Sequence, residues 1–394
     1  METERQTKHV YFDHNATSPV LPEVLEAMIP YFNTSYGNPS SVHRFGREAR
    51  EAVDRAREQV AALLNADVDE IVFTGGGSES DNLAMKGFLD SPNGDSRHIV
   101  TSAVEHHAVV NSVDRLEELG HDVDYIGVDD RGELDITELE ETIGENTTIA
   151  SFMYANNETG VIFDIPRISS ILKKNGIVFH TDAVQAAGKI PIDVKKDGID
   201  LLSISGHKMG APKGMGVLFV KKGIRLTPLI HGGHHEFGMR AGTENVPSIV
   251  GLGMAAELSR LRLSKEMERI SRLRDKLESG VLDVVPDVSI NGKGSPRLPN
   301  TTNISFHYVE GEGILLGLDL KGIAVSSGSA CTAGELKVSH VLSAMHIDAV
   351  IAQGSIRFSL GPDSTEDDVD YVLSTLPPII ERLRAMSPLS SDRK

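Results

Sequence analysis

Short apolar runs alternate with helical patterns over the first two thirds of the chain. Residues 46–64 carry apolar positions at the spacing of an amphipathic helix, and the run at 70–74 that follows them is typical of a buried strand. Further strand-like runs, with helical spacing between several of them, lie at residues 97–102, 122–128, 147–155, 176–182, 200–205 and 216–222. Because strands separated by helices form a mainly parallel sheet covered on both faces, we predict a large α/β domain over residues 15–260.

The pattern changes in the last third of the chain. A long charged helix is predicted at residues 264–283, strand signals follow at 303–309 and 355–361, and a further helix comes near the end. We therefore predict a smaller α+β domain made of residues 1–14 and 261–394. A chain of 394 residues is longer than one ordinary core requires, which agrees with two domains.

The chain is acidic, with 57 acidic and 39 basic residues and a net charge of −18. A surface of this sign repels phosphate backbones and anionic lipids, so we expect neither nucleic acid nor a membrane as a partner. No apolar stretch reaches the roughly 18 residues of a membrane span, and the N-terminus lacks the pattern of a targeting segment. We expect a soluble protein of the cytoplasm.

Cys331 is the only cysteine of the sequence. A single thiol excludes a disulfide within one chain and any zinc or iron–sulfur site that needs several cysteines. It lies among Ser, Gly, Ala and Thr in the segment 326–334, which is too small and polar to bury a structural cysteine well. We expect an exposed thiol, either reactive or exposed by chance.

The strand predicted at 70–74 runs into Gly75, Gly76, Gly77 and Ser78 at the start of an expected helix. Glycines allow the backbone to approach an anion closely, and a helix N-terminus supplies free N–H groups beside the Ser78 hydroxyl. A phosphate could bind there. The spacing fits neither the dinucleotide fingerprint nor the P-loop, so an ordinary turn explains this motif equally well.

Two further motifs follow predicted strands. Lys208 stands in a Gly- and Pro-rich turn beside Ser205 and His207. Partial burial of such a lysine lowers its pKa and frees the amine for Schiff-base chemistry, whereas a solvated turn lysine is the simpler interpretation. Asp182 closes the strand at 176–182, where parallel sheets bind ligands and a carboxylate can hold a pyridine nitrogen protonated. Its alternative role is a helix N-cap.

Several motifs together resemble the NifS/IscS cysteine desulfurases, which are pyridoxal 5'-phosphate (PLP) enzymes with the aspartate-aminotransferase fold. In chain order they are residues 11–17 (YFDHNAT), 36–41 (YGNPSS), 104–106 (VEH), 156–160 (NNETG), 182–185 (DAVQ), 205–210 (SGHKMG), 240–245 (RAGTEN) and 326–334 (SSGSACTAG). The last resembles the catalytic-cysteine loop of that family. The resemblance implies fold type I of the PLP-dependent transferases, with a mainly parallel seven-stranded sheet in the large domain and a smaller α+β domain.

The resemblance also implies a role for each matching residue. Lys208 would bind PLP covalently, Asp182 would pair with its pyridine nitrogen, and His106 would stack on the ring and transfer protons. Arg357 would clamp the substrate carboxylate, and Cys331 would be the catalytic thiol. The remaining contacts implied are Gln185 to the ring hydroxyl, Gly77, Ser78, Ser205 and His207 to the phosphate, Thr243 to the phosphate from the other subunit of a homodimer, Asn157 to cofactor and substrate, and Asn38 to the substrate.

The sequence departs from the family pattern at three places. Residues 75–80 read GGGSES where the family usually has SGATES, and Ala211 replaces a usual glycine. His234 and His235 stand where a Gly-Gln or Gly-His pair is common. We interpret both histidines as surface loop residues, and without carboxylates at ligand spacing we expect no metal site. The differences concern phosphate affinity and loop shape rather than the chemistry.

The implied activity converts L-cysteine to L-alanine, with the sulfur carried as a persulfide on Cys331. Lys208 would remove the Cα proton and the Cys331 thiolate would attack the substrate sulfur, which requires the segment 326–334 to move into the site and out again. The sulfur acceptor implied is an iron–sulfur scaffold protein, with tRNA thiolation and nitrogenase maturation as other destinations.

Three alternatives to this activity stay open at the level of sequence. An aminotransferase or a selenocysteine lyase would use Lys208 and Asp182, but simple transamination needs no thiol. A scaffold protein with a degenerate PLP fold would have lost the chemistry, although every residue that the chemistry needs is present. A cofactor-free thiol hydrolase would leave Lys208 and Asp182 without a role.

Overall fold

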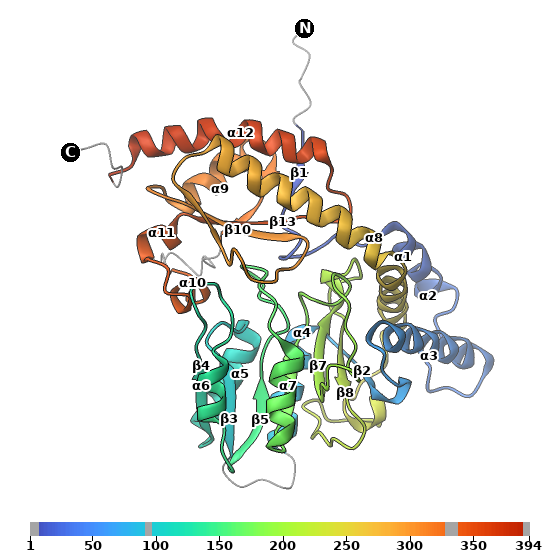
Figure 1. Ribbon diagram of the computed structural model, residues 1–394. Helices are drawn as coiled ribbons and strands as arrows, with labels where there is room; N and C mark the ends of the chain where they lie inside the picture. The colour runs from blue at the N-terminus through green and yellow to red at the C-terminus, as the bar shows by residue number, and fades with distance from the viewer. Residues whose placement is uncertain (1–7, 91–96, 328–337, 389–394) are drawn as a thin grey trace.

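Two β-sheets form the framework of the molecule, one above the other in Figure 1. The structure is a computed structural model that describes residues 8–90, 97–327 and 338–388. A seven-stranded sheet occupies the lower part of the view, and a four-stranded sheet with its helices occupies the upper part.

The larger sheet confirms the mainly parallel, seven-stranded sheet that was expected. In order across the sheet, its strands are β2 (Ile71–Thr74), β8 (Gly216–Val220), β7 (Leu201–Ser205), β6 (Val178–Asp182), β5 (Thr147–Ser151), β3 (His98–Ser102) and β4 (Asp122–Ile126). Only β8 runs against the others, since it pairs antiparallel with both β2 and β7. The run at 147–155 forms a strand only as far as Ser151, because from Ala155 the chain turns back to pair with Ile162.

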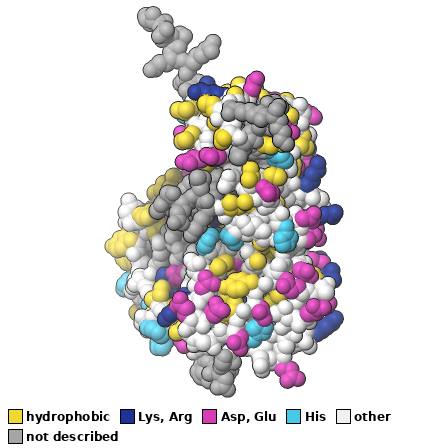
Figure 2. All heavy atoms as spheres, turned by 90° about the vertical axis from the view of Figure 1, so that its left-hand side faces the viewer, with side chains coloured by type: hydrophobic (Ala, Val, Ile, Leu, Met, Phe, Trp, Pro, Cys, Tyr) yellow, Lys and Arg dark blue, Asp and Glu magenta, His cyan; other side chains and the backbone are white. Residues whose placement is uncertain are grey.

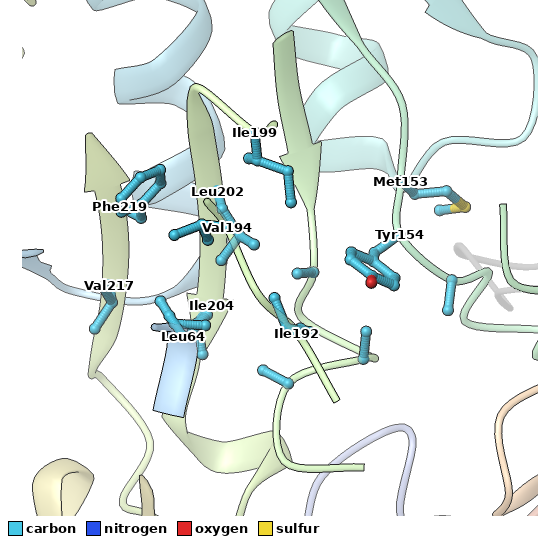
Figure 3. Packing of buried hydrophobic residues seen from close by; sticks show 14 of the residues in the cluster. Leu64, Met153, Tyr154, Ile192, Val194, Ile199, Leu202, Ile204, Val217 and Phe219 are labelled. Atoms are coloured by element: carbon cyan, nitrogen blue, oxygen red, sulfur yellow. The ribbon is translucent and has the colours of Figure 1, made fainter. Parts of the chain in front are cut away.

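Helices cover both faces of this sheet because its strands are apolar on both sides. They are α4 (Gly77–Leu89) and α5 (His107–Glu118) on one face, and α3 (Arg44–Leu64), α6 (Ile136–Thr142), α7 (Ile165–Lys174) and the first half of α8 on the other. Successive residues of β2 alternate between the two cores, so that Val72 joins the first and Phe73 the second. Figure 3 shows Ile204 of the second core near Leu64 of α3, with Leu202 and Phe219 farther along their strands.

The smaller sheet is antiparallel, as expected for an α+β part of the chain. Its strands, in order, are β12 (Ser326–Ser327), β13 (Ser355–Ser359), β10 (Thr301–Phe306) and β9 (Val288–Asn291). The elements that pack around it are α9 (Gly311–Asp319), α12 (Glu366–Met386), the second half of α8, and a two-stranded parallel pair of β1 (Val10–Tyr11) with β11 (Ile323–Ala324). Strand β1 thereby belongs to the core of the C-terminal part.

The remaining helices of the described ranges are short. They are α1 (Pro22–Met28), α2 (Pro30–Asn33), α10 (His340–Ala344), α11 (Ala349–Gln353) and the 3-10 turns Val68–Glu70, Gly206–Lys208 and Glu236–Gly238. Of these, the turn at Gly206–Lys208 matters most for function, because it carries the lysine singled out in the sequence.

Helix α8 (Val246–Val284) begins well before the helix predicted at 264–283. Its N-terminus is capped by Asn245, whose side chain accepts the N–H of Ser248. Glycines in its first half weaken the helical pattern in the sequence, but they permit close packing, since a Cβ at Gly253 would lie 2.6 Å from the backbone of α3. The first half of α8 packs in the large core and the second half in the small one. We propose that the boundary between the two domains, near residue 260, lies inside this helix.

Acidic side chains are spread over the face of the molecule that Figure 2 shows. Figure 2 shows Asp and Glu scattered across one face of the molecule rather than gathered in a single patch, in keeping with the net charge of −18. None of the helices in the described ranges is long and apolar enough to cross a membrane.

The packing of α8 predicts that two of its leucines contribute differently to the free energy of unfolding. Leu277→Ala should lower the free energy of unfolding by about 2–5 kcal/mol, because the side chain is fully buried in the small core. Leu261→Ala on the same helix is the matched control, since Leu261 is 65% exposed, and it should change that free energy by less than about 0.5 kcal/mol. Urea denaturation of both variants measures the two changes. Equal losses would contradict the packing described for α8.

Candidate active site

A cavity of about 630 Å³ opens at the carboxyl ends of the parallel strands. Its wall is formed by the segments that follow β2, β3, β5, β6 and β7, together with residues 15–17 and Arg357 of β13. Open parallel sheets bind ligands at this edge. The cavity therefore lies where the position of Asp182 at the end of a strand predicted a site.

The structure brings most of the predicted site residues together in this wall. Those that line the cavity are Gly77, Ser78, His106, Asn157, Asp182, Gln185, Ser205, His207, Lys208 and Arg357. Asn38 and Thr243 are exposed and do not line it. Cys331 lies outside the described residues. The individual roles of all these residues stay predictions.

Two glycines shape the turn after β2. Gly76 has a φ of 149°, which only glycine adopts readily, and it directly precedes α4. Gly216 on the neighbouring strand lies so close that a Cβ there would be 2.5 Å from the Gly76 backbone. The turn places Ser78 and the N–H groups at the start of α4 in the cavity wall, where they have no partner within the helix. This arrangement favours an anion site over an ordinary turn.

Lys208 lies in the cavity wall at the turn after β7. Its Nζ donates hydrogen bonds to the backbone oxygens of Asn15 and Ala16, at 2.5 and 2.7 Å. Desolvation and the positive charge of Arg357 lower its pKa to about 8, although two nearby carboxyl groups act in the opposite direction. At a pH near 8, a substantial share of the Lys208 amine is therefore neutral, whereas a solvated turn lysine would be almost fully protonated.

Asp182 ends β6 with two further carboxyl groups buried near it. Its Oδ1 accepts the N–H of Val184 at 2.8 Å, and burial raises its pKa against the lowering effect of His106. Burial also raises the pKa of Glu105 to about 8 and that of Asp81 well above its usual range. Among the described residues, Asp81 Oδ1 has no hydrogen-bond partner, and the ring of His180 lies 3.6 Å from it. A cation bound beside these carboxyl groups would stabilise their ionised forms, so the group is suited to a positively charged ligand.

His106 is the N-cap of α5. Its Nδ1 accepts the N–H of Ala108 at 3.1 Å, so the neutral ring carries its proton on Nε2. Desolvation lowers the pKa of His106, and the opposing effect of Asp182 does not cancel this. A neutral ring in the cavity wall is suited both to stacking and to proton transfer at Nε2.

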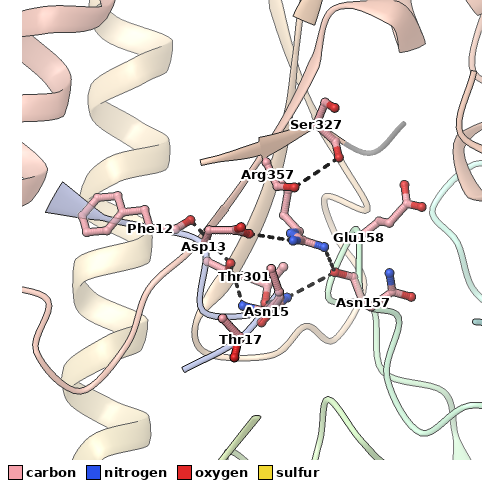
Figure 4. Close-up of polar contacts among 12 residues, drawn as sticks. Phe12, Asp13, Asn15, Thr17, Asn157, Glu158, Thr301, Ser327 and Arg357 are labelled. Atoms are coloured by element: carbon pink, nitrogen blue, oxygen red, sulfur yellow. Dashed lines mark hydrogen bonds and ion pairs between the residues drawn. The ribbon is translucent and has the colours of Figure 1, made fainter. Parts of the chain in front are cut away.

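Arg357 reaches the cavity from β13 of the smaller sheet (Figure 4). Its Nη2 donates to Asp13 Oδ1 at 2.7 Å, and its Nη1 donates to the backbone oxygen of Asn157 at 3.1 Å. The residue is 7% exposed, and its Nε has no hydrogen-bond partner within the described ranges. A buried guanidinium with donor capacity left over is suited to the carboxylate of a small ligand.

Asn15 joins the parts of the site, although sequence analysis assigned it no role of its own. Its Nδ2 donates to Thr301 Oγ1 at 2.9 Å and to the backbone oxygen of Asn157 at 3.2 Å (Figure 4). Its own backbone oxygen accepts from Gln185 Nε2 at 3.0 Å and from Lys208. Asn15 belongs to the motif at 11–17, which was the only signal available for it.

Lys189 is a second residue that the sequence did not single out. Its Nζ turns inward and donates to Gln185 Oε1 at 2.9 Å and to Asn15 Oδ1 at 3.1 Å. Desolvation lowers its pKa well below the usual range. A lysine four residues after Gln185 has no sequence pattern that distinguishes it from an exposed lysine, so its inward position could be recognised only from the structure.

The donor set of the cavity fits PLP. A protonated pyridine nitrogen is the cation that the buried carboxyl group at Asp182 favours, and Lys208 offers a partly neutral amine for an aldehyde. The start of α4, Ser205 and His207 provide donors for a phosphate. The ring of His207 is neutral, because desolvation and the Lys208 charge lower its pKa to about 4, and it lies 3.1 Å from Thr17 Oγ1.

Known proteins are similar in sequence to this chain over nearly its whole length. A cysteine desulfurase of Trichormus azollae is 53% identical over 97% of this chain and 96% of its own length. A cysteine desulfurase IscS of Dictyoglomus turgidum is 49% identical over 98% of both chains. A solved structure of a NifS-like protein has a TM-score of 0.90 and 40% identity, and covers 95% of this chain and 100% of its own.

A family-wide comparison agrees with these relatives. The pattern of the aminotransferase class-V family matches residues 10–372. The expected resemblance, the PLP-dependent transferase fold and the cofactor are confirmed by these matches. This chain is a PLP-dependent enzyme and belongs to the aminotransferase class-V family.

Proposed function

We propose that this protein is a cysteine desulfurase that converts L-cysteine to L-alanine and carries the released sulfur as a persulfide on Cys331. The observation that supports this most is the meeting of Lys208, Asp182 and Arg357 in one cavity. They provide an amine, an acidic partner for a pyridine nitrogen, and a donor for a carboxylate. The named relatives that match nearly the whole chain are cysteine desulfurases, which further supports the proposal.

For each part of the cofactor we propose a partner among the residues of the cavity. PLP, when bound, supplies an electron-withdrawing ring that makes the Cα–H of an amino acid acidic. Lys208 would hold it covalently through Nζ, and Asp182 would keep its ring nitrogen protonated. The other residues proposed to hold it are Gly77, Ser78, Ser205 and His207 at the phosphate, His106 and Asn157 against the ring, and Gln185 at the ring hydroxyl.

Arg357 and Lys208 would act directly on the substrate. The guanidinium of Arg357 would bind the substrate carboxylate in place of part of its contact with Asp13, with Asn157 and Asn38 as further substrate contacts. The Lys208 amine, released by the incoming substrate amine, would take the Cα proton on Nζ. Its lowered pKa makes it a base near neutral pH, because less of it is already protonated there.

Cys331, in its thiolate form, would receive the sulfur of the substrate. An S–S bond forms between Cys331 and the substrate sulfur while the substrate Cβ–S bond breaks, and its electron pair stays on Cβ. Cβ then takes a proton, for which His106 Nε2 is the proposed donor. L-cysteine and one thiol thereby yield L-alanine and one persulfide, and no outside oxidant is needed.

An exposed apolar segment supports the proposed homodimer. Over residues 25–45 the exposed large apolar side chains are Leu25, Ile29, Phe32, Tyr36, Val42 and Phe45, of which Phe32 is 62% and Val42 is 90% exposed. The segment that carries Thr243 lies beside it, since Glu244 pairs with Arg50 at 2.7 Å. A partner covering this region could therefore receive Thr243 at its own phosphate site.

The persulfide must leave the protein for the sulfur to be used. A sulfur atom passes from a persulfide to an attacking thiolate of another protein. We therefore propose a sulfur-acceptor protein, such as an iron–sulfur scaffold, as the partner, and the cytoplasm as the place of action.

The role of Cys331 can be tested by Cys331→Ser. Alanine release from L-cysteine, measured with a thiol reductant present, should fall more than about 1,000-fold, because the nucleophile is lost. The variant should keep its bound PLP and the change in visible absorbance when L-cysteine is added. If the variant releases alanine at the wild-type rate, the sulfur does not pass through Cys331, and an aminotransferase or lyase becomes the better account.

The lowered pKa of Lys208 predicts a pH dependence in the cofactor-free protein. The neutral amine is the reactive form, and its fraction rises with pH, so the rate of covalent PLP uptake should increase through a midpoint near the pKa of about 8 and then level off. Stopped-flow absorbance from pH 6 to about 10 measures this. A rate still rising at the upper end would mean that Lys208 keeps its ordinary pKa of 10.5.

The proposed dimer can be tested by charge introduction. Phe32→Asp should shift the wild-type dimer toward monomer in light scattering, because it places a charge in the apolar segment. Leu320→Asp is the control, since Leu320 is 82% exposed but lies on the smaller domain, and this variant should stay dimeric. A monomeric wild type would contradict the proposed homodimer.

A further inference from the structure

The segment 236–240 is hydrogen-bonded to residues on both sides of the turn that follows β2. Two contacts join them, one at each end of this segment. Glu236 accepts the N–H of Phe73 at 2.8 Å, just before the turn, and Arg240 Nε donates to Glu79 Oε1 at 2.9 Å, just after it. The segment and the turn are therefore fixed relative to each other on both sides of Gly75–Ser78.

The first contact is rigid enough to sustain backbone strain. Glu236 and Phe237 have φ values of 45° and 56°, a region that residues other than glycine rarely adopt. Such strain persists only where the surroundings impose it. Here Arg57 donates Nη1 and Nη2 to the buried Glu236 carboxylate at 2.8 and 2.9 Å, and its guanidinium lies over the rings of Phe73 and Phe237.

The second contact involves a carboxylate at the edge of the cavity. Glu79 lines the cavity together with Gly75–Ser78, and its Oε2 accepts the N–H of Gly75 at 2.8 Å. An unpaired negative charge here would repel the phosphate that this turn is proposed to bind. Arg240 stands at 2.9 Å from Oε1 and 3.5 Å from Oε2, so its guanidinium offsets that charge.

We propose that Arg240 is a positioning residue for the phosphate of PLP: by pairing with Glu79 it neutralises the carboxylate in the turn and keeps it on the Gly75 N–H. This inference rests on the proposed PLP chemistry. Arg240 does not line the cavity and would act only through Glu79. The pair is 28% and 22% exposed on its two side chains, so solvent screens it in part and the effect should be moderate.

The test compares binding of PLP with that of pyridoxal, which lacks the phosphate, by the visible absorbance of the Lys208 adduct. Arg240→Gln should weaken PLP binding by about tenfold and pyridoxal binding by less than about twofold, because only PLP meets the uncompensated Glu79 charge. Adding Glu79→Gln to that variant should restore PLP binding to within about threefold of wild type, because the repelling charge is then gone.

Arg269→Gln is the matched control. Arg269 pairs with Glu266 at 2.8 Å on α8, and its side chain is 28% exposed, as that of Arg240 is. Its removal should leave the affinities for both compounds unchanged. If Arg240→Gln folds poorly by circular dichroism, Arg240→Lys keeps the charge without the planar fork, and it should weaken PLP binding by only about threefold while leaving pyridoxal unaffected.

The other outcomes overturn the inference. Arg240→Gln must not weaken the binding of PLP and pyridoxal equally, and Glu79→Gln must restore PLP binding. If either condition fails, Arg240 maintains the structure of the turn and does not act by neutralising the Glu79 carboxylate. If Arg240→Gln binds PLP as wild type does, the pair has no role at the phosphate. If the wild-type protein takes up neither compound, the proposed PLP chemistry itself fails, and the assignment of Arg240 fails with it.

Discussion

The site depends on charged groups that are kept largely out of water at one edge of the seven-stranded sheet. Lys208 and Arg357 supply positive charge there, and Asp182 supplies negative charge with Asp81 and Glu105 near it. Charges interact more strongly where water is scarce, and an ion without a partner is costly there. The cost is reduced where a buried side chain is neutral rather than charged. Burial therefore lowers the pKa of Lys208, so that part of its amine is neutral and reactive.

The short segment at residues 12–17 contacts both parts of the molecule. Phe12 packs in the core of the smaller domain, and Asn15 bonds to groups from both parts of the molecule. The backbone oxygens of Asn15 and Ala16 then accept from Lys208. The beginning of the chain thus fixes Arg357, which comes from β13, relative to the lysine at the end of β7. This segment, α8 and the contact of Arg357 with the backbone oxygen of Asn157 together hold the substrate and cofactor groups near one another.

Much of this could be predicted from the sequence. Apolar runs and helical spacing predicted the large sheet and most of its helices, and the rule that ligands bind at strand ends predicted a site at Asp182, which lies in the cavity wall. Helix α8 was predicted too short, because the glycines that fit it against α3 also hide its first half. Burial alone predicted the lowered pKa of Lys208, and Arg357 was expected at the site only through family resemblance.

Other features depend on contacts between distant parts of the chain. The inward turn of Lys189 and the bonds of Glu236 to Arg57 and Phe73 leave no local pattern, because neither charge nor spacing distinguishes these residues from surface ones. Burial of a charged side chain is decided by what packs around it in three dimensions.

Mass spectrometry of the protein after brief reaction with L-cysteine tests the central claim most directly. If sulfur is carried on Cys331, the peptide that contains this residue gains the mass of one sulfur atom, and a thiol reductant removes it. Formation of alanine with no added sulfur on that peptide at any time of reaction would contradict the account.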